Sequence, residues 1–201
     1  MLKRLKAVRS EVRVRDSEIL GQKIVNIFRE LDLLKPQATI AMFRSLSYEI
    51  DLTFLESKLA ATVELAFPVT QSTQPPKLHF YRVAPGNLNQ FNRGAFGVEE
   101  PDAKFSGHQQ IQLADLAVVL VPGLCFGPEG ARLGHGKGFY DYFLKSIPNV
   151  LRIAVGYSFQ WLPSLSKETW DQPWDLFVTP DFVKVHDRKE QPLNLRGLSN
   201  E

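Results

Sequence analysis

Apolar residues recur along the first third of the chain with spacings that predict alternating helices and strands. In residues 17–34 they follow a helical period, which predicts an amphipathic helix. Short apolar runs at 38–43 and 63–67, the second closed by Pro68, predict two strands, and 49–60 predicts a helix between them. The change from helical to strand spacing and back is typical of β-α-β units.

Four later apolar segments predict further strands. They lie at 77–83, 115–123, 152–158 and 175–180. The segment DLAVVLVPG at 115–123 is a nearly continuous aliphatic run, as expected of a parallel strand that is buried on both faces. With a helix predicted at 139–146, the fold class is α/β, a three-layer α/β/α domain with a mainly parallel sheet.

Three segments fall outside this alternation. Residues 84–112 are rich in turn formers, and because strands resume directly after them we predict an excursion that covers a cleft. Residues 1–16 are basic, which is typical of a solvated helix face and less often of an anion-binding arm. Residues 187–201 are polar and are predicted to be loosely held. We expect residues 1–201 to form a single domain.

Composition narrows the classes of function. The net charge of +2 gives no general basis for binding nucleic acid. The single cysteine, Cys125, excludes an intramolecular disulfide and a multi-cysteine metal site, and its apolar neighbours predict a packed side chain. No apolar stretch approaches the roughly 20 residues of a membrane span, and the charged start lacks the apolar core of a secretory signal. We expect a soluble, cytoplasmic protein with no membrane partner.

The segment GARLGHGKGFYDYFL at 130–144 carries the strongest chemical signal. Its alternating glycines are Gly134, Gly136 and Gly138, and they lie between the predicted strand and the predicted helix at 139–146. Ligands of open α/β sheets bind at this edge, where free N–H groups and the helix dipole suit phosphate. Glycine lets the main chain approach an anion closely, and Arg132 and Lys137 add full positive charges.

Weaker interpretations of the same segment stay open. The loop matches neither the phosphate-loop motif nor the dinucleotide fingerprint, so it could simply connect strand to helix. Asp141, in the first helical turn, suits Mg²⁺ beside a phosphate, or it stabilises the helix dipole. The three tryptophans are predicted to line the core or a cleft rather than to stack on a ligand. They are Trp161, Trp170 and Trp174.

The block VPGLCFGPEGARLGHGKGFYDYFL at 121–144 closely resembles the signature of the 5-formyltetrahydrofolate cyclo-ligase family, also called 5,10-methenyltetrahydrofolate synthetases. SLSYEIDL at 45–52, VEEPD at 98–102 and the block at 159–179 resemble other stretches of that family. The resemblance implies a Rossmann-like (NagB/RpiA-like) fold. Gly127 stands where an aspartate is common in the family, and Phe139 replaces a usual tyrosine.

The resemblance also implies which residues form the site. The ATP-binding residues are expected to be Lys3, Arg4, Arg132, Leu133, Gly134, His135, Gly136, Lys137, Gly138, Phe139 and Tyr140. The substrate-binding residues are expected to be Arg44, Glu49, His135, Gly136, Lys137, Gly138 and Phe139. Asp141 and Asp171 are expected to hold Mg²⁺, and Lys137 and Tyr140 to be catalytic. Core packing is the alternative for the two aromatic residues, and a peripheral role is the alternative for His135.

The implied activity is the ATP- and Mg²⁺-dependent cyclisation of 5-formyltetrahydrofolate to 5,10-methenyltetrahydrofolate, with release of ADP and phosphate. The γ-phosphate activates the formamide oxygen, and N10 of the folate then attacks. Two alternatives remain: a non-catalytic folate- or nucleotide-binding relative, and an α/β enzyme of the sugar-phosphate isomerase type that needs no ATP. We expect a monomer or a weak dimer with no nucleic-acid partner.

The amino-terminal segment departs from the family pattern. Family members begin with a Lys-x-x-Leu-Arg element that contributes to the ATP site. Counting back from the predicted helix start at Ser17 places this element before residue 1. We therefore predict either a shortened start or a replacement of the element by KRLK at 3–6 together with Arg9.

Overall fold

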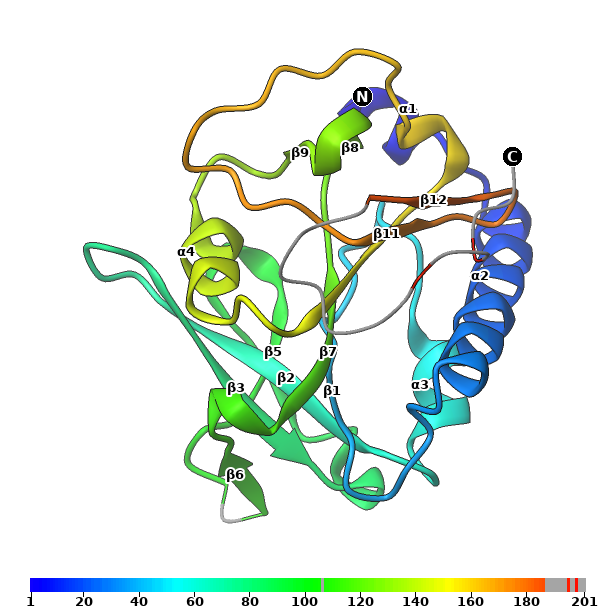
Figure 1. The fold of residues 1–201 in the computed structure, drawn as a ribbon. Coiled ribbons are helices and arrows are strands. Elements are labelled where there is room, and N and C mark those ends of the chain that lie inside the picture. Colours follow the sequence, from blue (N-terminus) through cyan, green and yellow to red (C-terminus); the bar gives the residue numbers. More distant parts are fainter. Residues whose placement is uncertain (106, 187–194, 196–197, 199–201) are drawn as a thin grey trace.

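The computed structural model of the 201-residue chain describes residues 1–105, 107–186, 195 and 198 (Figure 1). Most of the predicted loose tail at 187–201 lies outside these residues. Leu195, which falls within that tail, is 1% exposed and packs in the main core, and Leu198 packs against the same core. In the part of the chain that is described, no helix is both long and apolar enough to cross a membrane.

One eight-stranded sheet forms the centre of the molecule, in the order β12-β11-β10-β7-β1-β2-β3-β6. Its strands are β1 (Thr39–Ala41), β2 (Glu64–Gln71), β3 (Lys77–Val83), β6 (His108–Gln110), β7 (Leu116–Val121), β10 (Leu151–Val155), β11 (Leu176–Val178) and β12 (Val183–Val185). The strands from β11 to β2 are parallel, and the strands outside them pair antiparallel. The predicted mainly parallel α/β sheet is confirmed.

Helices cover both faces of this sheet. The α-helices are α1 (Leu2–Lys6), α2 (Ser10–Glu30), α3 (Thr53–Leu59) and α4 (Phe139–Ser146). The short 3₁₀ turns are η1 (Pro85–Asn87), η2 (Ala95–Gly97), η3 (Leu113–Asp115), η4 (Pro128–Gly130) and η5 (Ser158–Gln160). Two small hairpins, β4 (Phe91–Arg93) with β5 (Glu99–Pro101) and β8 (Cys125–Phe126) with β9 (Arg132–Leu133), lie outside the main sheet.

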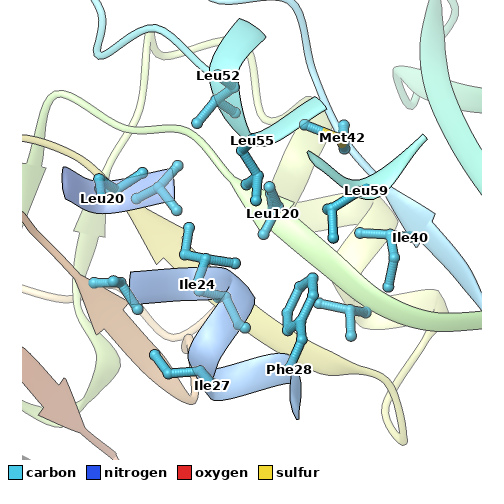
Figure 2. Packing of buried hydrophobic residues seen from close by; sticks show 14 of the residues in the cluster. Leu20, Ile24, Ile27, Phe28, Ile40, Met42, Leu52, Leu55, Leu59 and Leu120 are labelled. Atoms are coloured by element: carbon cyan, nitrogen blue, oxygen red, sulfur yellow. The ribbon is translucent and has the colours of Figure 1, made fainter. Parts of the chain in front are cut away.

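Successive residues of the central strands face opposite helices, which explains their continuous apolar runs. In β7, Val118 and Leu120 pack in the cluster with α2 and α3, whereas Val119 and Val121 pack in the cluster with α4. Figure 2 shows part of the first cluster, in which the labelled residues are Leu20, Ile24, Ile27, Phe28, Ile40, Met42, Leu52, Leu55, Leu59 and Leu120. The predicted three layers are therefore present.

The helix α2 differs from its prediction at both ends. It begins at Ser10 rather than at residue 17, because polar contacts replace the apolar period in its first turns: Arg13 donates to the carbonyl of Ser47. It ends at Glu30, where Asp32 takes a left-handed φ of 55° and the N–H of Leu33 donates to the carbonyl of Phe28 at 2.8 Å. This closing motif usually has glycine at the left-handed position, so an aspartate there does not reveal it in the sequence.

One strand prediction was wrong in extent, and residues 84–112 contain strands that were not predicted. Pro68 does not close β2, which continues to Gln71 and pairs Pro68 with Phe80 of β3. The carbonyl of Ala66 points toward β1 and accepts a hydrogen bond from the N–H of Met42. The nitrogen of Pro68, two residues further along β2, points to the same side but lies beyond the end of β1. No hydrogen bond of the sheet therefore needs an N–H at Pro68. The excursion at 84–112 is not free of strands, because β6 within it extends the main sheet.

Candidate active site

The predicted phosphate loop lies where parallel strand β7 leads into helix α4. We call residues 134–138 the glycine loop. Gly136 and Gly138 have φ angles of +75° and +72°, and Gly138 is the left-handed residue immediately before α4. A Cβ on Gly134 would lie 2.7 Å from Nη1 of Arg132, so a side chain there would displace that guanidinium. Each glycine of the predicted alternation therefore has a backbone or packing reason.

The base of the glycine loop is fixed by a glutamine that sequence reasoning missed. Gln160, 2% exposed, donates from Nε2 to the carbonyls of Gly123 and Leu124 at 2.7 and 3.2 Å. Its Oε1 accepts from the N–H of Tyr157 at 2.7 Å. The N–H of Leu124 in turn donates to the carbonyl of Leu133, the residue before the loop, at 2.7 Å. Gln160 thus ties the end of β10 to the root of the loop.

Arg132 and Asp141, predicted to bind different ligands, form an ion pair. Nη2 of Arg132 lies 2.8 Å from Oδ1 of Asp141, and the side chain of Arg132 is only 5% exposed. Its Nη1 donates to the carbonyl of Pro122 at 3.4 Å. The guanidinium is therefore held beneath the loop, with its charge directed at the first turn of α4.

Tyr140 places a buried hydroxyl beside this ion pair. The guanidinium of Arg132 lies 5.8 Å from its ring, and its Oη has no hydrogen-bond partner among the described residues. Burial raises the pKa of Tyr140, the negative charge of Glu49 raises it further, and Arg132 opposes both effects. The phenol consequently stays protonated at neutral pH and can donate a hydrogen bond.

The predicted substrate carboxylate reaches the glycine loop from the neighbouring strand. We call residues 42–52, which follow β1, the β1 flank. Glu49 is 8% exposed; its Oε2 accepts from the N–H of Leu46 at 2.9 Å, and its Oε1 lies 3.5 Å from Nε2 of His135. The rings of His135 and Tyr48 are 6.2 Å apart. Glu49, His135 and Tyr140 therefore come together, although they lie in separate segments of the sequence.

Arg44, also predicted to touch substrate, is engaged with the protein. Its Nη1 lies 2.5 Å from Glu56, and its Nη2 donates to the carbonyl of Leu88 at 2.6 Å. Its guanidinium lies 4.3 Å from the ring centre of Phe91. These contacts pin the excursion at 84–112 onto the β1 flank. Burial raises the pKa of Glu56, and Arg44 opposes that shift.

An aromatic side chain of the excursion reaches the glycine loop. Phe96 is 55% exposed and has a φ of 64°, which is rare for a residue with a large side chain. Its ring lies 5.8 Å from that of Phe139, and Nζ of Lys137 lies 5.7 Å from its centre. Sequence reasoning did not single out Phe96, since no local pattern marks a left-handed phenylalanine.

The second predicted metal ligand lies on the segment that follows β10. We call residues 161–173 the strap, drawn in orange above β8 and β9 in Figure 1. Asp171 accepts from the N–H of Glu168 at 2.8 Å through Oδ2, and the N–H of Gln172 points at Oδ1 of Asp141 at 3.5 Å. Each aspartate thus keeps one carboxylate oxygen without a partner in the described ranges.

The donor set suits Mg²⁺ held jointly with phosphates. The described residues contain no group of three or more His, Cys, Asp or Glu side chains placed to hold a metal. Mg²⁺ commonly takes one or two carboxylates, with phosphate oxygens and waters completing its shell. The free oxygens of Asp141 and Asp171 fit that pattern, and they do not form an all-protein cage.

The amino-terminal basic residues lie on α1. The guanidinium of Arg4 lies 4.7 Å from the ring centre of Phe159, and Nζ of Lys6 lies 5.8 Å from that of Tyr48. Lys3 is exposed. Because α2 begins at Ser10, the count back from residue 17 started at the wrong place. The segment KRLK is itself helical and docks, through Arg4 and Lys6, on loops at the carboxyl ends of β10 and β1.

The tryptophans separate into three environments. Trp174 is buried and donates from Nε1 to the carbonyl of Ala131 at 3.0 Å. Trp161 is partly buried and stacks on Phe177 at 6.2 Å. Trp170, in contrast, is 66% exposed, so it is no part of the core.

Comparisons with known proteins agree with this architecture. A model of the 5-formyltetrahydrofolate cyclo-ligase family matches residues 1–180. The 5-formyltetrahydrofolate cyclo-ligase of Escherichia coli (strain K12) is 31% identical over 148 residues, covering 72% of this chain and 79% of that relative.

Two solved structures are similar throughout. The NMR structure of Aquifex aeolicus 5,10-methenyltetrahydrofolate synthetase superposes with a TM-score of 0.70 at 29% identity, covering 98% of this chain and 94% of that one. A 5,10-methenyltetrahydrofolate synthetase from Mycoplasma pneumoniae gives a TM-score of 0.67 at 20% identity, covering 89% of this chain and 93% of that one, and supports the fold alone.

Proposed function

Because the chain belongs to the 5-formyltetrahydrofolate cyclo-ligase family, we propose that it catalyses the ATP- and Mg²⁺-dependent cyclisation of 5-formyltetrahydrofolate to 5,10-methenyltetrahydrofolate. ADP and phosphate are the other products. We further infer that residues 1–201 act as one catalytic domain, which the continuous sheet from β12 to β6 supports.

The observation that carries the proposal is the meeting of three elements at one edge of the sheet. The glycine loop follows β7, and the β1 flank brings the buried carboxylate of Glu49 to within 3.5 Å of His135 in that loop. Tyr140, at the start of α4, adds a buried hydroxyl without a partner among the described residues. A phosphate cradle thus faces a carboxylate and a proton donor, as transfer of a phosphoryl group onto an amide oxygen requires.

The proposed folate site lies against the β1 flank. Glu49 accepts a hydrogen bond from the pterin ring and orients the nitrogen that carries the formyl group. The unpartnered hydroxyl of Tyr140 costs roughly 1–3 kcal/mol when buried, and a substrate oxygen would satisfy it. Because its pKa is raised, Tyr140 donates this hydrogen bond rather than removing a proton.

The proposed triphosphate site is the glycine loop itself. Backbone N–H groups at the start of α4 bind phosphate oxygens, and the exposed Lys137 adds a mobile positive charge. Arg132, fixed beneath the loop by Asp141, contributes its charge without moving. Asp141 and Asp171 would hold Mg²⁺, which neutralises charge on the phosphates.

The reaction then requires alignment more than new covalent chemistry from the protein. The formyl oxygen attacks the γ-phosphorus, the bond from that phosphorus to the β-phosphate oxygen breaks, and ADP leaves. N10 next attacks the activated formyl carbon, and its proton passes to the leaving phosphate. Hydrogen phosphate then departs with the former formyl oxygen, leaving the methenyl cation. Lys137 and Tyr140 stabilise the oxygens on which negative charge develops.

A coupled absorbance assay tests the proposal. The purified chain is incubated with 5-formyltetrahydrofolate, Mg²⁺ and ATP, and the near-ultraviolet absorbance of the methenyl product is followed together with ADP release. We expect equal amounts of both products, and none when either ATP or the folate is omitted. Binding of both ligands without turnover would indicate a non-catalytic relative, and ATP-independent isomerisation of a sugar phosphate would indicate the other class.

A further inference from the structure

The strap forms a wall on the side of the glycine loop opposite to the β1 flank. In the sheet, β7 lies between β1 and β10, so the segments that follow β1 and β10 flank the loop that follows β7. The β1 flank carries Glu49, and the strap carries Asp171. If the triphosphate lies in the glycine loop and the folate lies against Glu49, the side of the loop next to the strap is left for the ribose and base of the nucleotide.

The strap is anchored along its length to the segment that leads into the glycine loop. The N–H of Leu162 donates to the carbonyl of Phe126 at 2.8 Å, and Nζ of Lys167 donates to that of Glu129 at 3.3 Å. A Cβ on Gly127 would lie 2.7 Å from Cβ of Leu165. The glycine that replaces a common aspartate at position 127 therefore lets the strap approach.

A tight turn in the strap presents Trp170 to solvent. The N–H of Glu168 donates to Oδ2 of Asp171 at 2.8 Å, and the N–H of Asp171 donates back to the carbonyl of Glu168 at 3.1 Å. Nε2 of Gln172 donates to the carbonyl of Trp170 at 3.1 Å. The backbone around Trp170 is therefore set, while its indole stays in water.

Trp170 is the most exposed of the large apolar side chains among the described residues, at 66%. Trp170 directly precedes Asp171. The N–H of Gln172, which follows Asp171, points at Oδ1 of Asp141. A large flat ring that is left in water beside the proposed metal ligands offers a stacking surface for a second flat ring. The base of a nucleotide whose phosphates lie in the glycine loop is such a ring.

We propose that Trp170 stacks on the adenine of ATP and that the strap is the base-binding wall of the nucleotide site. This inference rests on the proposed function, because it takes the glycine loop as the triphosphate site. Stacking on an aromatic ring accepts every base, so Trp170 supplies affinity and not discrimination between ATP and GTP. Removing the ring should weaken binding of any ligand that has a base and should spare the triphosphate alone.

Calorimetric titrations of the full chain with two probes test this. ADP carries a base, and inorganic tripolyphosphate does not; both are titrated with Mg²⁺. For Trp170→Ala we expect the Kd of ADP to rise about tenfold while the Kd of tripolyphosphate stays unchanged, and for Trp170→Phe we expect the Kd of ADP to stay near that of the wild type. An unchanged Kd of ADP in Trp170→Ala, or an equal loss for both probes, would overturn the proposal.

Tryptophan fluorescence provides the matched control. ADP should quench the emission of the exposed indole in the wild type and in Trp161→Phe, whereas Trp170→Phe should lose that response. Quenching that persists in Trp170→Phe would contradict base stacking. If the wild type turns over the folate in the coupled assay yet the Trp170 variants bind ADP normally, this inference fails alone. If the wild type binds neither probe, the ATP site and the proposed function fail with it.

Discussion

The β1 flank and the strap border the same glycine loop, but they are built in different ways. The β1 flank buries its charges: Glu49 is 8% exposed, and Arg44 pairs with Glu56 of α3 where little solvent reaches them. The strap is mostly exposed, and backbone donors and close contacts attach it to residues 126–130. One side is thus ordered through side-chain charge and the other through main-chain anchors.

This difference matches what each side is proposed to do. Stabilisation of developing charge is strongest where water is excluded and the polar groups are already placed, as at Glu49 and Tyr140. A flat stacking surface such as the indole of Trp170 needs no burial in the free protein, because the bound ligand covers the ring. The following variants test the division, from the largest expected effect to the smallest.

Asp141→Asn should have the largest effect. The change removes the negative charge shared by Arg132 and the proposed metal, while the amide oxygen can still accept from Arg132. We expect kcat to fall by roughly a hundredfold to a thousandfold with the fold intact. Asp115→Asn, which neutralises an exposed aspartate elsewhere, is the control and should behave as the wild type. Full activity of Asp141→Asn would show that the phosphate site is misplaced.

Tyr140→Phe separates activity from stability. The hydroxyl has no partner in the described part of the chain, so its removal should leave the urea midpoint unchanged or slightly higher, while kcat falls by about a hundredfold. Tyr142→Phe, on the same helix and 54% exposed, should change neither quantity. A large loss of stability in Tyr140→Phe with normal turnover would make the hydroxyl structural.

Phe96→Gly tests which side holds the folate. Glycine tolerates the left-handed backbone at φ 64°, so stability should not fall, whereas Phe96→Ala keeps the strained angle. We expect the KM for the folate to rise about five- to tenfold, because an aromatic contact is lost, and the KM for ATP to stay constant. A rise in the KM for ATP alone would reverse the assignment of the two sides.

Tyr157→Phe should have the smallest effect and should be seen only at alkaline pH. Burial and the charges of Asp16 and Asp51 raise the pKa of Tyr157 to about 12, although Arg13 opposes them. Since the folded protein then holds this proton more tightly than the unfolded chain, stability falls as pH rises from about 10 towards 12. Unfolding midpoints across that range should decline less steeply in the variant. Identical slopes would contradict the assignment.

The sequence predicted those parts of the molecule that follow from local patterns. The bounds of α4 at Phe139 and Ser146 agree with the prediction, because Gly138 and a following proline mark the two ends. The burial of β7 on both faces followed from its continuous aliphatic run. The convergence of Glu49 with the glycine loop followed from family resemblance, since no spacing within the chain links positions 49 and 135.

The features that escaped prediction depend on contacts between distant segments. Gln160 fixes the root of the glycine loop through carbonyls that lie 37 and 36 positions earlier in the chain. The exposure of Trp170 depends on how the strap is held against residues 126–130, and composition cannot distinguish such a residue from a core tryptophan. Strands of three residues, such as β6 and β12, are too short to show a period of two.

The central claim is that the glycine loop directs the γ-phosphate onto the formyl oxygen of the folate. Its most direct test is to supply 5-formyltetrahydrofolate labelled with oxygen-18 in the formyl group and to analyse the released phosphate by mass spectrometry. We predict that each phosphate released by the wild type carries one labelled oxygen. Unlabelled phosphate, formed at the same rate as the methenyl product, would contradict the claim.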